Sequence, residues 1–245
     1  MNLTDKKIMI VGTTSGIGKA IACQLSALGA KLVLVDDNEL EQISLASSME
    51  GVSYYTFNYL NCAEILQNFK QIVDNEGKMD GYVFTVTHSD FRPLNLVDNK
   101  NLTNIMNNNF SVFIESVRCL MKSKGINEGG SIVVMSSISS IRAMKAKMAF
   151  CSSKAATDAA VRCLAAELGS KQIRVNSVQK GGVDVDLEKS HVQDIAAINN
   201  NATEQKQILG LVKSEEIGNT VAFLLGDAAK SITGTAIVID GGYTL

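Results

Sequence analysis

The chain has 245 residues, of which 46 % are hydrophobic, and it carries 23 Lys and Arg against 25 Asp and Glu. That is enough apolar material for a large buried core, and no Pro-, Gly- or Ser-rich linker or charge block divides the chain, so we expect one domain over residues 1–245. The balanced charge, without a basic cluster, argues against nucleic acid and anionic membranes as partners.

The amino terminus and the cysteines indicate a cytoplasmic protein. "MNLTDKKIMIVG" places charged residues before a short apolar run, which is not the pattern of a secretory signal, and no apolar run is long enough to span a membrane. The cysteines are scattered and form no Cys-x-x-Cys pair, so neither a disulfide framework nor a metal site is indicated: Cys23, Cys62, Cys119, Cys151 and Cys163. We expect reduced thiols.

Short apolar runs alternate with longer segments of helical spacing along the whole chain. The runs are "KIMIVG", "KLVLVD", "VSYYTF", "GYVFTV", "SIVVMS", "IRVNSV" and "AIVID". Runs that are apolar on both faces are typical of strands covered by helices on both sides. The alternation predicts an α/β fold, a doubly wound parallel sheet of about seven strands.

Two of the helical segments carry clear end signals. In residues 18–29, "GKAIACQLSALG", the residues Ile21, Leu25 and Leu28 share a face and Gly29 ends the helix. In residues 61–76, Asn61 followed by Glu64 forms a capping box at the first turn.

A glycine-rich turn follows the first strand, in "VGTTSGIGKAIA". Gly12, Gly16 and Gly18 allow a tight turn whose backbone N–H groups approach a pyrophosphate at the start of a helix. Asp36 ends the second strand, where a carboxylate accepts hydrogen bonds from an adenosine ribose and repels a 2′-phosphate. No arginine occupies the turn, so we predict NAD(H) rather than NADP(H). The alternative is that Asp36 and Asp37 only cap the next helix.

Several motifs together resemble the short-chain dehydrogenase/reductase family over essentially all 245 residues. They are "GTTSGIG" (12–18), "FNYLN" (57–61), "NNFSVF" (108–113), "VVMSS" (133–137), "FCSSK" (150–154), "IRVNSV" and "VIDGGY" (238–243). The resemblance implies a Rossmann fold in a single NAD(P)-binding domain, with a substrate lid at about residues 184–210. It also implies a homodimer or homotetramer, with which the small residues of segment 151–169 agree.

The same resemblance assigns roles to individual residues. Ser137 is the catalytic serine, Lys154 the catalytic lysine that also binds the nicotinamide ribose, and Asn108 the asparagine that holds a water in the proton relay. The residues expected at the cofactor are Gly12, Ser15, Gly16, Ile17, Gly18, Asp36, Asn58, Lys154, Gly181 and Val183.

Three departures from the family pattern bear on function. Phe150 stands where the family has its catalytic tyrosine, four residues before Lys154. The fourth strand ends in "FTVT" (84–87) instead of Asn-Asn-Ala-Gly, which braces the sheet and flanks the cofactor. Lys180 replaces the proline that normally begins the turn past the nicotinamide.

The loss of the tyrosine matters because reduction of a ketone needs a hydride at carbon and a proton at oxygen. A tyrosine has a pKa near 10, which the lysine one helical turn away lowers, whereas a phenyl ring has no proton to donate. General acid catalysis typically contributes about 10²–10⁴ in rate, so ordinary turnover should be slow.

Other side chains offer partial replacements. His88 follows the fourth strand at the carboxyl edge and has a suitable unperturbed pKa near 6.5, although a loop histidine facing water is the plainer interpretation. Lys180 has two interpretations. It either binds a carboxylate or phosphate of the substrate, or it is a turn residue exposed to solvent. Cys151 points about 100° away from Phe150 on a helix, so we expect no chemistry from it. Met144 and Met148 are expected to line the pocket.

Two functional hypotheses follow. The first is an NAD(P)-dependent oxidoreductase that interconverts a ketone and a secondary alcohol with weakened acid catalysis. The alternative is a nucleotide-binding family member that has lost catalysis and acts through a partner or its own subunits. A deliberate Tyr-to-Phe substitution would also explain Phe150, but the "FTVT" and Lys180 departures favour natural divergence.

Overall fold

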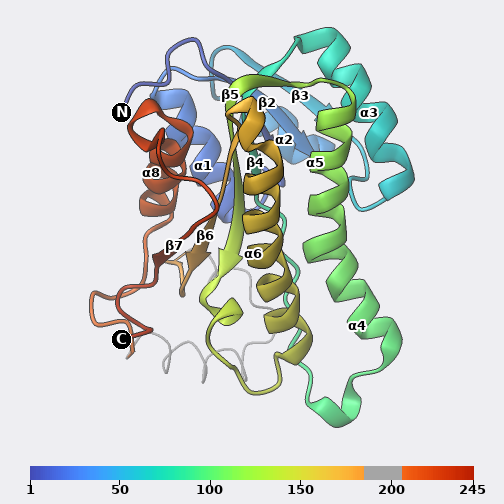
Figure 1. Ribbon diagram of the computed structural model, residues 1–245, viewed down its shortest axis with the longest axis vertical. Helices are drawn as coiled ribbons and strands as arrows, with labels where there is room; N and C mark the ends of the chain where they lie inside the picture. The colour runs from blue at the N-terminus through green and yellow to red at the C-terminus, as the bar shows by residue number, and fades with distance from the viewer. Residues whose placement is uncertain (185–205) are drawn as a thin grey trace.

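Strands and helices alternate along the chain as the apolar pattern predicts. The computed structural model describes residues 1–184 and 206–245 (Figure 1). The strands are β1 (Lys7–Val11), β2 (Lys31–Asp36), β3 (Val52–Thr56), β4 (Met79–Phe84), β5 (Ile126–Ser137), β6 (Arg174–Lys180) and β7 (Ala236–Ile239). The helices are α1 (Gly16–Ala27), α2 (Glu39–Ser47), α3 (Cys62–Glu76), α4 (Asn99–Met106), α5 (Val112–Lys122), α6 (Met148–Leu168) and α8 (Ser214–Leu225).

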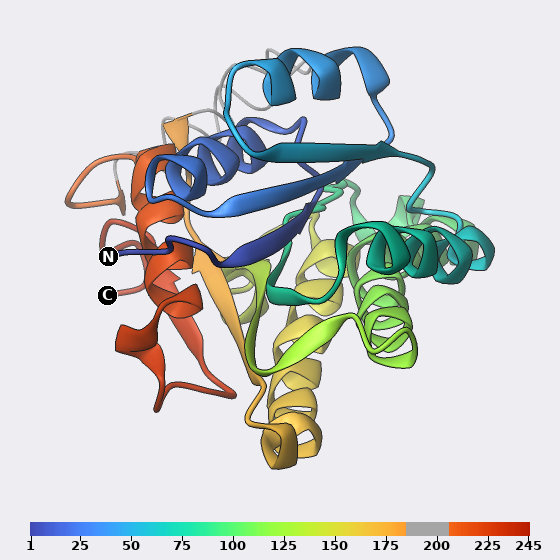
Figure 2. The ribbon, with the colours of Figure 1, turned by 90° about the horizontal axis from the view of Figure 1, so that it is seen from above.

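The seven strands form one parallel sheet in the order β3-β2-β1-β4-β5-β6-β7. Seen from above, the sheet is twisted, with α1, α2 and α8 on one side and α3, α5 and α6 on the other (Figure 2). The strand order reverses between β1 and β4. In sheets of this kind, ligands bind outside the carboxyl ends of the strands at such a reversal. The predicted doubly wound fold is confirmed.

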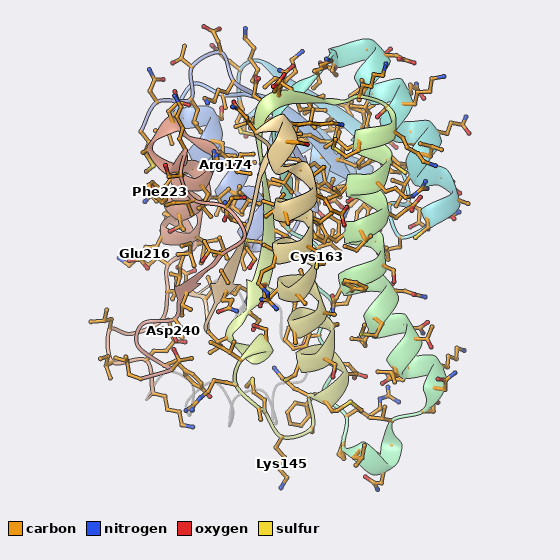
Figure 3. All side chains as sticks on the ribbon, viewed as in Figure 1. Lys145, Cys163, Arg174, Glu216, Phe223 and Asp240 are labelled. Carbon is orange, nitrogen blue, oxygen red and sulfur yellow. The ribbon has the colours of Figure 1, made fainter. Side chains whose placement is uncertain are left out.

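Both faces of the sheet are buried, because the strands are apolar on both faces. In β2, Leu32 and Leu34 join the core beneath α1 and α8, whereas Val33 and Val35 join the core beneath α3, α5 and α6. Arg174 fastens β6 to the end of α8: its guanidinium donates to the carbonyls of Leu224 (2.6 Å) and Gly226 (3.4 Å) (Figure 3).

The predicted helix ends are confirmed. α1 stops at Ala27, and Gly29 follows with φ +87°, a conformation that favours glycine. α3 begins after Asn61, whose side chain accepts the Ala63 N–H and donates to Glu64. In the described residues, no helix is both long and apolar enough to cross a membrane.

Two features differ from the sequence-based expectation. β5 begins at Ile126, five residues before its apolar run, and continues to Ser137. A π-helical turn, Asn107–Ser111, joins α4 to α5. Most of the predicted lid, residues 185–205, lies outside the described residues.

Candidate active site

The glycine-rich turn has the geometry of a phosphate-binding loop. Gly12 has φ +90°, and a Cβ there would come 2.5 Å from the Thr85 hydroxyl; a Cβ on Gly18 would collide with the Gly12 carbonyl. The Ser15 hydroxyl donates to that carbonyl (3.1 Å) and accepts the Gly18 N–H (3.0 Å). Gly16 and Ile17 open α1, where an α-helix leaves N–H groups without intrahelical acceptors. These residues fit a pyrophosphate.

Asp36 holds the turn against the end of β2. It is 2 % exposed, and its carboxylate accepts the N–H (2.8 Å) and the hydroxyl (2.9 Å) of Thr14 and the N–H of Asp37 (2.9 Å). The side chain that caps α2 is that of Asn38, so helix capping does not account for Asp36. Burial, followed by the charges of Asp36 and Asp37, raises the pKa of Tyr59, which lies after β3. The region around the end of β2 is therefore acidic.

Thr85 braces the sheet where the sequence lacks the expected asparagine. Its buried hydroxyl lies 2.9 Å from the Val11 carbonyl and 2.6 Å from the Gly12 carbonyl. The end of β4 is thereby tied to the phosphate turn by a different side chain, so the "FTVT" sequence keeps this part of the frame.

Asn109 rather than Asn108 occupies the buried position between α4 and α5. The Asn109 side chain accepts the His88 N–H (2.7 Å) and donates to the His88 carbonyl and the Ser153 hydroxyl, each at 2.9 Å. Asn108 is only half-buried. The π-helical turn shifts the inward-facing position by one residue, and the motif "NNFSVF" carries no signal of this shift.

Ser137 lies at the carboxyl end of β5, at the edge to which the phosphate turn also belongs. Its hydroxyl accepts the Ser139 N–H and donates to the Ser139 hydroxyl, both at 3.1 Å. Ser139 in turn donates to the Met144 sulfur (3.2 Å). Lys180 is paired with Ser137 across β5 and β6, so the two side chains leave the same face of the sheet.

Phe150 and Lys154 lie on the first turns of α6, beside β5. The Phe150 ring is buried, and the ammonium groups of Lys147 and Lys154 lie 5.7 Å and 5.9 Å from its centroid. Lys154 is 1 % exposed, and its Nζ donates to the Thr87 hydroxyl and the Met135 carbonyl, each at 3.0 Å. Two lysine side chains therefore lie close to the ring.

The electrostatic environment of Lys154 is unusual for a lysine. Burial lowers the pKa of Lys154 to about 7; the charge of Lys180 lowers it further, and Asp158 opposes both effects. Burial and the charge of Lys154 also lower the pKa of His88. His88 is therefore neutral at pH 7, which weakens the hypothesis that it donates the proton.

The remaining expected residues lie along the same edge. Asn58 is exposed after β3, and its side chain accepts the Leu60 N–H (3.0 Å). Gly181 packs so closely on Asp240 that a Cβ would come 2.8 Å from the Asp240 Cα. Val183 is buried in a bridge with Val212.

Two of the side chains near Phe150 face away from it or into solvent. Cys151 lines an open depression between the start of α6 and the segment after β5, together with Ser139, Ser140, Ile141, Arg142, Ala143, Ser152 and Ala155. Met148 is 40 % exposed. In the described part of the chain, no three His, Cys, Asp or Glu side chains gather as they would around a metal ion.

Comparisons with known proteins agree with this geometry. A family model described as "Enoyl-(Acyl carrier protein) reductase" matches residues 11–244. The chain belongs to the short-chain dehydrogenase/reductase family. Members of this family are oxidoreductases that bind nicotinamide cofactors.

Similar members of the family are named for different activities. An L-xylulose reductase of Caenorhabditis elegans is 29 % identical over 99 % of this chain and 97 % of its own length. An enoyl-[acyl-carrier-protein] reductase [NADH] of Nostoc is also 29 % identical, over 100 % and 98 %. A Serratia marcescens short-chain dehydrogenase/reductase structure superposes with a TM-score of 0.91 at 24 % identity, covering both chains completely. The similarity to the Serratia marcescens structure supports the fold alone.

A buried hydrogen-bond network around Asp158 was not predicted from the sequence of this short-chain dehydrogenase/reductase. Asp158, one turn beyond Lys154 on α6, accepts hydrogen bonds from Ser177 and Gln179 of β6, each at 2.7 Å, and Gln179 also donates to Ser140 (2.8 Å). An isolated Asp in the helical pattern gives no signal of this network, because its partners lie on another element.

Proposed function

We propose that this chain is an NAD(P)H-dependent reductase that interconverts a ketone and a secondary alcohol, with NADH preferred and with proton delivery altered at Phe150. The observation that carries the proposal is the meeting of Ser137, Lys154 and Phe150 at the sheet edge that also holds the phosphate turn. A protein retained only for its fold would have no need to keep both polar members of this group.

The residues present have separable tasks. The turn at Gly12–Gly18 binds the pyrophosphate, and Asp36 favours an adenosine ribose without a 2′-phosphate. The Ser137 hydroxyl orients and polarises the substrate oxygen once it exchanges its bond to Ser139 for one to the substrate. The bound nicotinamide supplies the hydride. Phe150 closes the pocket but contributes no proton.

A second candidate activity is reduction of a carbon–carbon double bond conjugated to a carbonyl. The matching family model and the Nostoc relative are described as enoyl reductases. Phe150 is compatible with this chemistry. The negative charge that develops on the carbonyl oxygen needs stabilisation, but the proton finally bonds to carbon, so no acid is required at the oxygen.

The test is a titration with NADH and NADPH, followed by turnover on a panel of ketones, sugars and one enoyl thioester. Saturable NADH binding with turnover on a carbonyl compound supports the first proposal, and turnover confined to the enoyl thioester supports the second. Binding without turnover on any compound supports the alternative, a nucleotide-binding family member that acts through a partner or its subunits. If neither nucleotide binds, all three are wrong.

A further inference from the structure

The hydroxyl groups of Ser137 and Ser139 form a short chain that ends on the sulfur of Met144. The Ser137 hydroxyl lies 3.1 Å from the Ser139 hydroxyl, which lies 3.2 Å from the Met144 Sδ. The backbone N–H of Ser139 also donates to the Ser137 oxygen, at 3.1 Å. Ser137 is 8 % exposed and Ser139 is 5 % exposed, so solvent does not readily compete for these bonds.

The Met144 sulfur fixes the direction of this hydrogen-bond chain. A thioether sulfur accepts a hydrogen bond and has no proton to donate, so the Ser139 proton points at Met144. A hydroxyl has a single proton, and the Ser139 oxygen is therefore the acceptor in its contact with Ser137. Ser139 thus holds the Ser137 proton. One lone pair of the Ser137 oxygen takes the Ser139 N–H, and the other remains for a ligand.

This direction suits an alcohol better than a ketone. An alcohol hydroxyl donates its proton to the remaining lone pair of the Ser137 oxygen, while the bond from Ser137 to Ser139 stays in place. A ketone oxygen only accepts, so it needs the Ser137 proton, and the buried Ser139 oxygen then loses its donor. The loss of one neutral hydrogen bond corresponds to a factor of about 2–10 in affinity.

Resting on the function proposed above, we propose that Ser139 and Met144 are positioning residues that make Ser137 favour the alcohol over the ketone of a substrate pair. Met144 directs the Ser139 proton, and Ser139 in turn holds the Ser137 proton, so both residues act through Ser137. The reductase is therefore held back by its alcohol product, and its site is better occupied in the direction of alcohol oxidation.

The direction of the hydrogen-bond chain can be measured without any substrate. Neutron diffraction from D₂O-exchanged crystals of the cofactor-free protein locates the hydroxyl deuterons. We expect the Ser139 deuteron on the line to the Met144 Sδ and the Ser137 deuteron on the line to the Ser139 oxygen. A Ser139 deuteron that points at Ser137 overturns the proposal, whatever the activity of the protein.

The consequence for binding is measured with the ketone that turns over in the panel and with its alcohol. The alcohol is titrated into the complex with NADH and the ketone into the complex with NAD⁺, because neither mixture reacts. Met144→Leu keeps a similar volume but removes the acceptor, so the Ser139 hydroxyl becomes able to donate to Ser137. We expect this change to lower the Kd of the ketone about 2- to 10-fold and to leave that of the alcohol within about 2-fold. Ser139→Ala should do the same, because it removes the group that holds the Ser137 proton.

Met121→Leu is the matched control. Met121 is half-buried like Met144, but it lies in the last turn of α5, next to the start of β5 at the opposite edge of the sheet, and its replacement should change neither Kd. If Met144→Leu and Ser139→Ala weaken both ligands equally, or change neither Kd, the two residues are only structural and the proposal is wrong. Absence of turnover on every compound overturns the proposed function, and the preference for the alcohol with it, even where the deuterons lie as expected.

Discussion

Phe150 stands where the proposed function would place a catalytic tyrosine, and its surroundings suit a phenol. Two ammonium groups lie within 6 Å of the ring centroid, and Ser137 stands at the end of the neighbouring strand. Cations close to a phenol favour its ionised form and so lower its pKa. Under the proposed function, these groups would activate a tyrosine at position 150.

Phe150→Tyr should therefore raise reductase turnover on an accepted carbonyl compound by on the order of 10²-fold. The added hydroxyl gains a short proton path to the substrate oxygen, and the lysines help it to ionise. The measurement is NADH oxidation by wild type and variant on the same compounds. If the variant binds NADH normally and gains nothing, the pocket is not arranged for this chemistry, and the nucleotide-binding alternative gains support.

His88→Ala should leave turnover at pH 7 within a few-fold of wild type and NADH affinity unchanged. The backbone of residue 88 remains clamped by Asn109, and the imidazole is neutral at this pH because its pKa is lowered by burial and by Lys154. Steady-state kinetics with a matched NADH titration measure both effects. If the variant loses all turnover while still binding NADH, this prediction is wrong and His88 is the general acid.

Asp36 is expected to decide between the two nucleotides. Wild type should bind NADH more tightly than NADPH, and Asp36→Ala should narrow this gap by about 10-fold or more, the equivalent of one hydrogen bond to a charged group. Asp37→Ala is the control, because Asp37 is exposed and next in sequence. Fluorescence titrations give both affinities. A wild-type preference for NADPH would contradict the assignment.

At the scale of the elements, the junction of α4 and α5 holds the loop after β4 in place. The π-helical turn directs Asn109 inward, where it satisfies both backbone groups of His88. Such turns are rare and often occur at functional sites. The site therefore depends on one irregular turn between two regular helices.

Asn109→Ala should lower the free energy of unfolding by about 1–3 kcal/mol, because it leaves the N–H and carbonyl of His88 without their partner. Asn108→Ala, one residue away and half-buried, should change it by less than about 0.5 kcal/mol. Urea denaturation of the two variants measures the difference. Equal effects, or a larger effect at Asn108, would show that Asn109 is not the clamp.

At the scale of the whole molecule, the doubly wound parallel sheet could be predicted because local signals agree with tertiary ones. Strands such as β2 are apolar on both faces, and Gly29 and Asn61 mark helix ends through their own backbone and side-chain chemistry. Ser137 and Lys154, which the motifs single out, lie near each other at the carboxyl edge of the sheet. The π-helical turn, the brace at Thr85 and the Asp158 network could not, since each depends on partners from other elements.

The proposed function requires that this chain transfers a hydride from a nicotinamide to a carbonyl carbon. Its most direct test is NADH deuterated at C4, each epimer used separately, with the compound panel and product analysis by mass spectrometry. We expect one epimer to give an alcohol with a single deuterium on the former carbonyl carbon. Saturable NADH binding with no deuterium in any compound, from either epimer, would contradict the claim.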